Sequence, residues 1–367
     1  MKTLTPVSGP GPELRAYHLV FTNDGMPGYS RRRHGGSFRY HLPSGELLRD
    51  ADERQRIRAL AIPPAYEKVW ICSLPNGHLQ ATGIDQRGRK QYRYHASWQS
   101  LSADRKFEGI TEFARAIPLI RSRVAASLGA EGFVRDRIVA GIVGLLDHTG
   151  YRIGNKRYVK ENHSYGLTSL LSRHLFEEEG GWTLRFKGKS GRMHNAQVRS
   201  ARIATLMAEL HELPGQHLFR YEDDAGQWHD VGTSDVNEWL KNVGGGEFSA
   251  KQFRTWRASV LCARELAKAP AAETEAGRRR AEMEAIRHTA ERLHHTPATC
   301  RKYYVHPAIF ESYRNGRLHQ VMNRRPPRFP AGDKAAQLRA EERRLLWLIE
   351  HREKPGRTKR EKLSSPS

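Results

Sequence analysis

A pair of tyrosines near residue 300 lies among basic side chains. In the segment HHTPATCRKYYVHP, Tyr304 is close in sequence to Arg301 and Lys302 and to the start of an expected helix. A free tyrosine has a pKa of about 10 and is a weak nucleophile at neutral pH, but nearby cations lower the cost of forming the phenolate. The segment therefore offers a candidate nucleophile. On spacing alone, the simpler interpretation is that Tyr303 and Tyr304 are ordinary core or surface aromatics.

Other kinds of catalytic site leave no trace in the sequence. There is no glycine-rich loop followed by Lys-Ser/Thr, so the sequence shows no evident site for nucleotide hydrolysis. There is also no carboxylate cluster of the kind that holds two metal ions in nucleases. We therefore expect no cofactor and no metal, and any reaction must draw its nucleophile and its charge stabilisation from side chains.

The overall charge indicates the class of partner. The chain of 367 residues carries 62 Lys and Arg against 40 Asp and Glu, a formal net charge of +22. Such an excess favours a polyanion, because neutralising the phosphates of nucleic acid releases condensed counterions and drives binding. DNA or RNA is the leading candidate. The charge says nothing about chemistry, and a ribosomal or chromosome-packing protein would show the same excess.

Composition predicts a folded, soluble, intracellular protein. Hydrophobic residues make up 38% of the chain, enough for buried cores in two ordinary domains. Cys72, Cys262 and Cys300 are far apart and lack metal-ligand spacing, so we interpret them as reduced thiols. The N-terminus lacks the apolar stretch of a signal peptide, and no segment is long enough to cross a bilayer.

The pattern along the chain predicts an α+β protein. Residues 1–16, rich in Pro and Gly, are expected to form a flexible leader. In 17–98, short β-favouring segments such as SFRYHL and KVWICSL are broken by turn residues, with one helix over 51–60, which indicates a small, mainly antiparallel sheet domain. A polar segment, 97–109, marks the boundary. A mainly helical domain over 105–325 follows, and 326–367 comprises a linker, a helix and a basic tail.

Within the helical domain, several boundaries follow from local signals. Gly150 can end the helix whose apolar face begins at Val134. Asp235 and Ser249 are expected N-caps, and a long charged helix spans about 271–293. Three more features are expected: a β-hairpin over 182–198 with Lys189 near its tip, a helix beginning at Thr296-Pro297, and a short helix between Pro307 and Gly316.

The tyrosine segment resembles the active-site region of type IB DNA topoisomerases, above all the poxvirus and bacterial branch. In that family a His-Thr-Pro is followed by a basic pair and then by the nucleophilic tyrosine, nine residues after the histidine. Here His295 plus nine is Tyr304, and the family's Tyr-hydrophobic-His-Pro continuation falls on 304–307. This register selects Tyr304 over Tyr303.

Four more segments match in the family's order. YRIGNKRY resembles the element with the first catalytic arginine, here Arg152; FKGKSG resembles the hairpin with the catalytic lysine, here Lys189. KQFRTW resembles the Lys-x-x-Arg-Thr element and gives Arg254 as the second arginine. The stretch 79–95 resembles the part of the N-terminal domain that lies in the DNA major groove. The resemblance covers about residues 25–325.

The resemblance implies roles for these residues. Tyr304 would attack a backbone phosphorus, and the non-bridging oxygens would be stabilised by Arg152, Arg254 and a hydrogen bond from His295. Lys189 would protonate the leaving 5′ oxygen, with a relay through Lys251 as a further candidate. The expected product is a 3′-phosphotyrosyl bond, which stores the bond energy for religation and lets supercoils of both signs relax without ATP or metal.

Basic and aromatic residues alternate in the segment expected to contact DNA. They suit phosphate contacts beside base-edge or sugar contacts, and one amide is a possible base reader. The residues are Arg89, Lys90, Gln91, Tyr92, Arg93 and Tyr94, with Lys251 added from the catalytic domain. A solvated basic strand is the simpler alternative.

The resemblance also implies fold, partner and location. The second domain should have the tyrosine recombinase/type IB topoisomerase catalytic fold, with a small sheet among its helices. The partner is double-stranded DNA, gripped by a monomer that forms a clamp around the duplex, in the cytoplasm and associated with the nucleoid; no membrane contact is expected.

Two other interpretations stay open at this stage. A tyrosine recombinase shares the Arg–Lys–Arg–Tyr logic, but its second arginine usually lies in His-x-x-Arg, where this chain has Lys251-Gln252-Phe253-Arg254. A non-catalytic architectural protein would have the same charge and would bind DNA with strong salt dependence, but it would never form a covalent complex.

Overall fold

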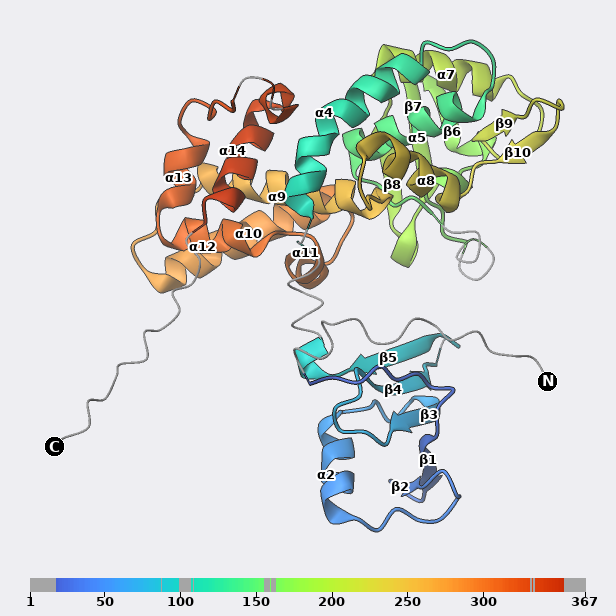
Figure 1. Cartoon of the computed structure of the whole chain (residues 1–367), viewed down its shortest axis with the longest axis vertical. Helices are drawn as coiled ribbons and strands as arrows, with labels where there is room; N and C mark the ends of the chain where they lie inside the picture. Colours follow the sequence, from blue (N-terminus) through green and yellow to red (C-terminus); the bar gives the residue numbers. More distant parts are fainter. Residues whose placement is uncertain are drawn as a thin grey trace. The chain divides into compact units, whose positions relative to one another are not determined.

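The computed structural model of the chain describes residues 18–86, 88–98, 107, 109–154, 159, 163–330, 332 and 334–352. The expected leader, Arg87, most of the expected boundary segment and the basic end after residue 352 lie outside these residues. The chain divides into two compact units, Met1–Lys106 and Phe107–Ser367 (Figure 1). Each unit has its own hydrophobic core.

The first unit is built on an antiparallel sheet with the strand order β2-β1-β3-β4-β5. Its strands are β1 (Gly28–His34), β2 (Ser37–His41), β3 (Glu67–Cys72), β4 (Leu79–Ile84) and β5 (Lys90–Tyr94). Helix α2 (Ala51–Ala59) contributes Ile57 to a core that also holds Val69 and Ile71 of β3. The expected sheet and helix are therefore confirmed.

Helix α2 is fixed at its start and along its side. The carboxylate of Asp50 accepts a hydrogen bond from the backbone N–H of Glu53 (2.9 Å), as an N-cap does. On the side that faces the sheet, Arg56 donates to the side-chain oxygen of Gln80 (2.6 Å) and to the carbonyl of Cys72 (2.7 Å). These bonds join the helix to β3 and β4.

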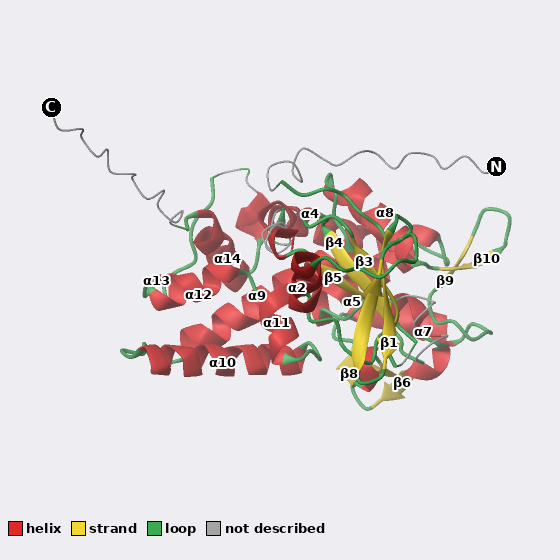
Figure 2. Cartoon of the chain, turned by 90° about the horizontal axis from the view of Figure 1, so that it is seen from below, coloured by secondary structure: helices red, strands yellow, loops and turns green. Residues whose placement is uncertain are grey.

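The second unit is mainly helical (Figures 1 and 2). Its α-helices are α4 (Ile110–Ser127), α5 (Arg135–Thr149), α7 (Ala201–His211), α8 (Thr233–Gly244), α9 (Ala250–Lys268), α10 (Glu275–Arg292), α11 (Pro297–Tyr303), α12 (Pro307–Arg314), α13 (Arg317–Met322) and α14 (Ala340–Glu350). Helix α9 contacts α4, α5, α8, α10, α12, α13 and α14. It is the central element of this unit and is well placed to carry a catalytic side chain.

Small sheets lie among the helices. Strands β6 (Leu175–Glu178), β7 (Gly181–Lys187) and β8 (Met193–Gln197) form one, and β9 (Arg220–Glu222) pairs with β10 (Trp228–Asp230). Helix α7 packs on β7 and on α5. Two glycines of α5 allow this approach, because a Cβ atom would lie 2.5 Å from Leu206 at Gly141 and 2.7 Å from Ile203 at Gly144.

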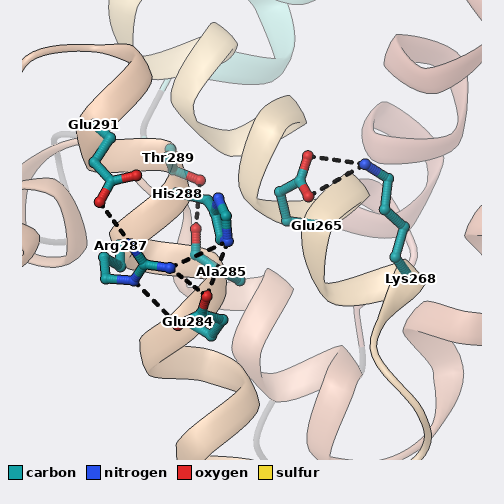
Figure 3. Close-up of polar contacts among 8 residues, drawn as sticks. All are labelled: Glu265, Lys268, Glu284, Ala285, Arg287, His288, Thr289 and Glu291. Atoms are coloured by element: carbon teal, nitrogen blue, oxygen red, sulfur yellow. Dashed lines mark hydrogen bonds and ion pairs between the residues drawn. The ribbon is translucent and has the colours of Figure 1, made fainter.

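Helix α10 shows how a very polar helix can pack against α9. Its outer face carries ion pairs, such as those of Arg287 with Glu284 (2.5 Å) and Glu291 (2.7 Å) (Figure 3). Exposed pairs of this kind contribute little to stability, because solvent screens them. The opposite face buries Ile286 and Ala290, so the packing of that face holds the helix in place.

Most of the expected elements are confirmed, and two boundaries were wrong. The hairpin is β7–β8, and Gly150 ends α5 in the left-handed conformation (φ 66°). Asp235 is not an N-cap: α8 begins at Thr233, and the Asp235 side chain reaches back to the N–H of Gly232 (2.7 Å). The long charged helix begins at Glu275, after the N-cap Thr274, rather than near residue 271.

No α-helix among the described residues is long and apolar enough to cross a membrane.

Candidate active site

Four of the five expected catalytic side chains meet in the second unit. The rings of His295 and Tyr304 are stacked, with centroids 4.2 Å apart. The Arg254 guanidinium carbon lies 5.4 Å from the centroid of the tyrosine ring. Arg152 and Arg254 both lie close enough to the Tyr304 hydroxyl to interact with it electrostatically. The phenol oxygen therefore faces two guanidinium groups.

Arg254 is fixed in place by hydrogen bonds from each of its three side-chain nitrogens. It lies on α9 with 3% of its surface exposed, and its Nε donates to Nε2 of His295 (2.7 Å). Its terminal nitrogens donate to the backbone carbonyls of Gly150 and Leu293. Burial, and then the charge of Arg152, lower the pKa of Arg254 to about 9, so it still carries its charge at neutral pH. Its guanidinium plane is therefore set before any ligand arrives.

His295 is a neutral hydrogen-bond donor. Because arginine has only donors, Nε2 of His295 must accept the bond from Arg254, and the ring proton then lies on Nδ1. Burial, followed by the charges of Arg254 and Arg152, lowers the pKa of His295 to about 2. Nδ1 is buried and has no partner among the described residues. An unsatisfied buried donor costs about 1–3 kcal/mol, which an acceptor bound at the site would recover.

Arg152 is positioned by the end of α5. Gly150 turns the chain out of the helix, and a Cβ atom there would lie 2.9 Å from the side chains of Arg257 and Leu293. Two residues later, Nη1 of Arg152 is buried without a partner among the described residues. Burial lowers the pKa of Arg152, and no described carboxylate is paired with either Arg152 or Arg254. This pair of cations is suited to an anion that comes from outside the protein.

Tyr304 is held by its backbone. It follows α11, whose N-cap Thr296 accepts from the N–H of Thr299 (3.2 Å), and its own N–H donates to the carbonyl of Cys300 (3.0 Å). The fully buried hydroxyl of Ser259, on α9, donates to the Tyr304 carbonyl (3.2 Å) and accepts from the N–H of His306 (3.0 Å). Sequence reasoning missed Ser259, because nothing in the sequence separates it from other serines.

Lys189, the fifth expected residue, is exposed in the turn Lys189–Gly191 between β7 and β8. The base of its hairpin does approach the site: His194 of β8 stacks on Phe186 (4.8 Å) and lies 4.1 Å, centroid to centroid, from His294. His294 directly precedes His295, so the lysine hairpin and the histidine segment are packed together.

The expected DNA-binding residues of the first unit lie on or beside β5, which is an edge strand. Lys90, Tyr92 and Tyr94 alternate along its exposed face, and the two tyrosine rings stack with centroids 6.1 Å apart. Tyr92 is 49% exposed and Tyr94 38% exposed. Lys90 forms an ion pair with Asp24, so the face presents two stacked aromatic rings beside a cation that a DNA phosphate would have to take from its carboxylate partner.

The remaining expected residues also have partners within the protein or lie elsewhere. Arg89 pairs with Asp85 (2.7 Å), which also accepts from the side-chain amide of Gln91 (2.9 Å). Arg93 donates to the carbonyl of Ala61 (2.8 Å). Lys251 is exposed in the first turn of α9, three residues before Arg254. A base-reading role for Gln91 would require it to exchange its carboxylate partner for a base edge.

Taken together, the side chains of the site in the second unit are suited to hold a phosphate group opposite a tyrosine hydroxyl. Guanidinium groups hold phosphate through planar, charge-assisted hydrogen bonds, and the neutral His295 adds a donor without adding charge. The described residues contain no cluster of side chains that could hold a metal ion. The chemistry that this arrangement supports is phosphoryl transfer to or from tyrosine.

Comparison with known proteins agrees with this class of site. Residues 95–324 match the family model of the eukaryotic DNA topoisomerase I catalytic core, and residues 37–85 match that of the bacterial DNA topoisomerase IB N-terminal domain. DNA topoisomerase 1B of Acanthamoeba polyphaga mimivirus is 30% identical over 297 residues, which are 79% of this chain and 88% of the relative. DNA topoisomerase 1 of Rabbit fibroma virus (strain Kasza) is 26% identical over 195 residues, 52% of this chain and 57% of the relative.

The chain belongs to the type IB DNA topoisomerases. This assignment confirms the enzyme class that the sequence indicated and favours it over a tyrosine recombinase or a non-catalytic architectural protein.

Proposed function

We propose that this enzyme relaxes duplex DNA by cutting and rejoining one strand through Tyr304. The observation that carries the proposal is the pair of guanidinium groups, Arg152 and Arg254, beside the tyrosine hydroxyl, with the unpartnered N–H of His295 in the same group. A scissile phosphate bound there would satisfy these donors and would lie in line for attack by the phenol oxygen.

The reaction exchanges one phosphodiester bond for another. The Tyr304 oxygen bonds to phosphorus, its proton leaves to solvent, and the bond from phosphorus to the 5′ oxygen breaks. Lys189 gives a proton to that oxygen, directly or by relay through Lys251. The result is a 3′-phosphotyrosyl bond and a free 5′ hydroxyl. Because the number of phosphodiester bonds is unchanged, religation needs neither ATP nor metal.

Relaxation follows from the lifetime of this intermediate. While one strand is cut, the duplex beyond the break can rotate, and the torsional energy of the supercoil supplies the drive. Rotation is possible in either direction, so supercoils of both signs should relax. We further propose that the enzyme acts as a monomer that closes around the duplex, with the exposed face of β5 as part of the DNA contact. We also propose that it works in the cytoplasm, at the nucleoid. The formal charge of +22 and the exposed Lys90, Tyr92 and Tyr94 support the DNA contact.

The test is covalent trapping. Labelled duplex is mixed with the enzyme in EDTA, and the reaction is stopped with SDS. We expect a DNA–protein adduct with the wild-type chain and with Tyr303→Phe, but none with Tyr304→Phe, which should still bind the duplex. Tyr303 is the matched control because it is the adjacent tyrosine and is 39% exposed. An adduct with Tyr304→Phe would overturn the assignment of the nucleophile, and a dependence on magnesium would overturn the metal-free reaction.

A further inference from the structure

A basic cavity of about 510 Å³ lies in the second unit, separate from the four active-site side chains. Its walls come from the end of α5, from β8 and the short segment after it, from α9, from the end of α10 and from the residue that precedes α14. Four of the lining residues are arginines: Arg199, Arg257, Arg292 and Arg339. The last of these lies beyond residue 324, where the match to the catalytic-core family ends.

These arginines have too few anionic partners. Among the described residues, no carboxylate is paired with Arg199, Arg257 or Arg292. Arg339 lies 3.6 Å from Asp147, but both oxygens of that carboxylate already accept bonds of 2.9 Å from Arg121. The cavity therefore carries a surplus of positive charge that the described part of the protein does not neutralise.

Arg257 shows what this surplus costs. It is half-buried, and burial lowers its pKa; the charge of Asp147 opposes this shift, but the charges of Arg339, Arg264 and Arg292 add to it. Its Nη1 lies 3.4 Å from the backbone carbonyl of Asp147. Cations held together in this way repel one another, and a bound anion would relieve the repulsion.

The size and chemistry of the cavity limit what could bind. Its volume falls within the range of about 300–1,000 Å³ that is usual for small-ligand sites. Thr149, Asn195 and Gln197 add neutral hydrogen-bonding groups to the wall. Planar arginine forks arranged around a concave site are suited to phosphate oxygens.

We propose that this cavity is a second phosphate-binding site, which takes a compact group with two or more negative charges. Arg199, Arg257, Arg292 and Arg339 supply the charge-assisted hydrogen bonds. The site is distinct from the one that would hold the scissile phosphate and does not depend on the mechanism proposed for Tyr304.

Pyrophosphate is the probe. It is titrated into the full-length chain without DNA, by calorimetry at constant ionic strength. Because pyrophosphate can also enter the active site, the Arg152→Gln protein is titrated in parallel and should keep one saturable site. In that background, Arg199→Gln and Arg292→Gln should each weaken binding by about tenfold or more, as the loss of a charge-assisted bond predicts. Arg123→Gln, an exposed arginine of α4 outside the cavity, is the matched control and should bind as before.

Two results would overturn the proposal. One is complete loss of binding in Arg152→Gln, which would mean that pyrophosphate enters only the active site. The other is unchanged affinity in both Arg199→Gln and Arg292→Gln. Thermal melting of each variant shows that it is folded, so a loss of affinity is not a loss of structure.

A second arm separates the two sources of phosphate. The Tyr304→Phe protein is titrated with pyrophosphate after saturation with a short duplex. Unchanged affinity shows that the cavity stays open to a free phosphate compound while DNA is bound. Displacement, together with weaker duplex binding by Arg292→Gln, shows that the cavity takes a phosphate of the DNA backbone. Failure of the Tyr304 mechanism in the trapping assay would alter neither result.

Discussion

At the scale of single residues, the environment of His295 matters more than its identity. Histidine is often assumed to act as a cation near phosphate, but here burial beside two arginines lowers the pKa of His295 to about 2. The residue can therefore offer one N–H and no charge. The sequence predicted that His295 takes part, through its spacing from Tyr304. It could not predict the neutral state, which depends on burial and on Arg254, 41 positions away in the chain.

This view of His295 leads to a kinetic prediction. His295→Ala should slow single-turnover cleavage by about 10²–10³-fold, as the loss of a donor to a developing oxyanion usually does. His295→Gln should recover part of the rate, because its amide is also a neutral donor. Between pH 5 and 8, the rates of wild type and His295→Gln should have the same pH dependence. A step near pH 6.5 that disappears in His295→Gln would show instead that the imidazolium takes part.

Ser259 supports a second prediction at this scale. Ser259→Ala removes the donor to the Tyr304 carbonyl and leaves the N–H of His306 without its acceptor. We expect a loss of about 1–3 kcal/mol in the free energy of unfolding, together with slower cleavage at unchanged affinity for DNA. Ser312→Ala, at a buried serine of α12, is the matched control. Wild-type cleavage by folded Ser259→Ala would mean that the hydroxyl does not position the tyrosine.

At the scale of elements, the hairpin β7–β8 connects an exposed lysine to a buried site. Its two strands were predictable, because Trp182, Leu184 and Phe186 alternate before a polar turn. The adjoining strand β6 was not, since the segment LFEE has an exposed, acidic surface and becomes a strand by pairing with β7. The contact between His194 and His294 was also invisible, because the two residues are brought together by packing between a strand and the segment after α10.

Gly188 tests whether this packing positions Lys189. A Cβ atom at Gly188 would lie 2.3 Å from Nε2 of His194, so Gly188→Ala must shift the hairpin or the histidine. We expect cleavage to slow at least about tenfold, as small displacements of a catalytic group commonly cause. The turn residue Gly191 is the control: Gly191→Ala meets only the end of Lys187 at 3.6 Å, although its φ of 74° adds some strain.

A sulfur leaving group separates positioning from general damage. A substrate with sulfur in place of the bridging 5′ oxygen expels a thiolate, which needs no proton. Lys189→Ala and Gly188→Ala should both cleave this substrate at close to the wild-type rate, whereas Arg152→Ala should not. If sulfur rescues neither Lys189→Ala nor Gly188→Ala, the role of Lys189 as proton donor is wrong. If sulfur rescues Lys189→Ala but not Gly188→Ala, the change at Gly188 damages the fold instead of only displacing Lys189.

At the scale of the whole molecule, only the resemblance to a family predicted which distant residues form one site; local sequence patterns could not. Composition indicated nucleic acid, and periodicity gave many of the helices and strands, but neither brings Arg152, Arg254, His295 and Tyr304 together. Those residues come from the end of α5, from α9 and from the segments on either side of α11. Their convergence depends on long-range packing around α9, and a single sequence shows that packing only through motifs whose order is already known.

The same packing makes the stability of the second unit depend on pH. Burial lowers the pKa values of six histidines of this unit, including His148 and His294, and the largest shifts take His174 and His306 to about 4, His194 to about 3 and His295 to about 2. In the unfolded chain they titrate near 6.5, so below that pH the unfolded state binds more protons than the folded state. Stability is therefore complete above about pH 6.5 and falls as the pH drops, by at most about 1.4 kcal/mol per pH unit for each histidine.

Urea unfolding between pH 7.5 and 5 measures this dependence above the range in which carboxylates titrate. The four histidines with the largest shifts alone allow a slope of up to about 5 kcal/mol per pH unit near pH 5. His194→Phe keeps a flat ring against Phe186 and removes one titrating group. Its slope should therefore be smaller by about 1.4 kcal/mol per pH unit, which corresponds to one proton. His211→Phe, at an exposed histidine of α7, is the control and should leave the slope unchanged. A flat profile for the wild-type chain would mean that these imidazoles take up protons without unfolding, and the neutral state assigned to His295 would then lose its support.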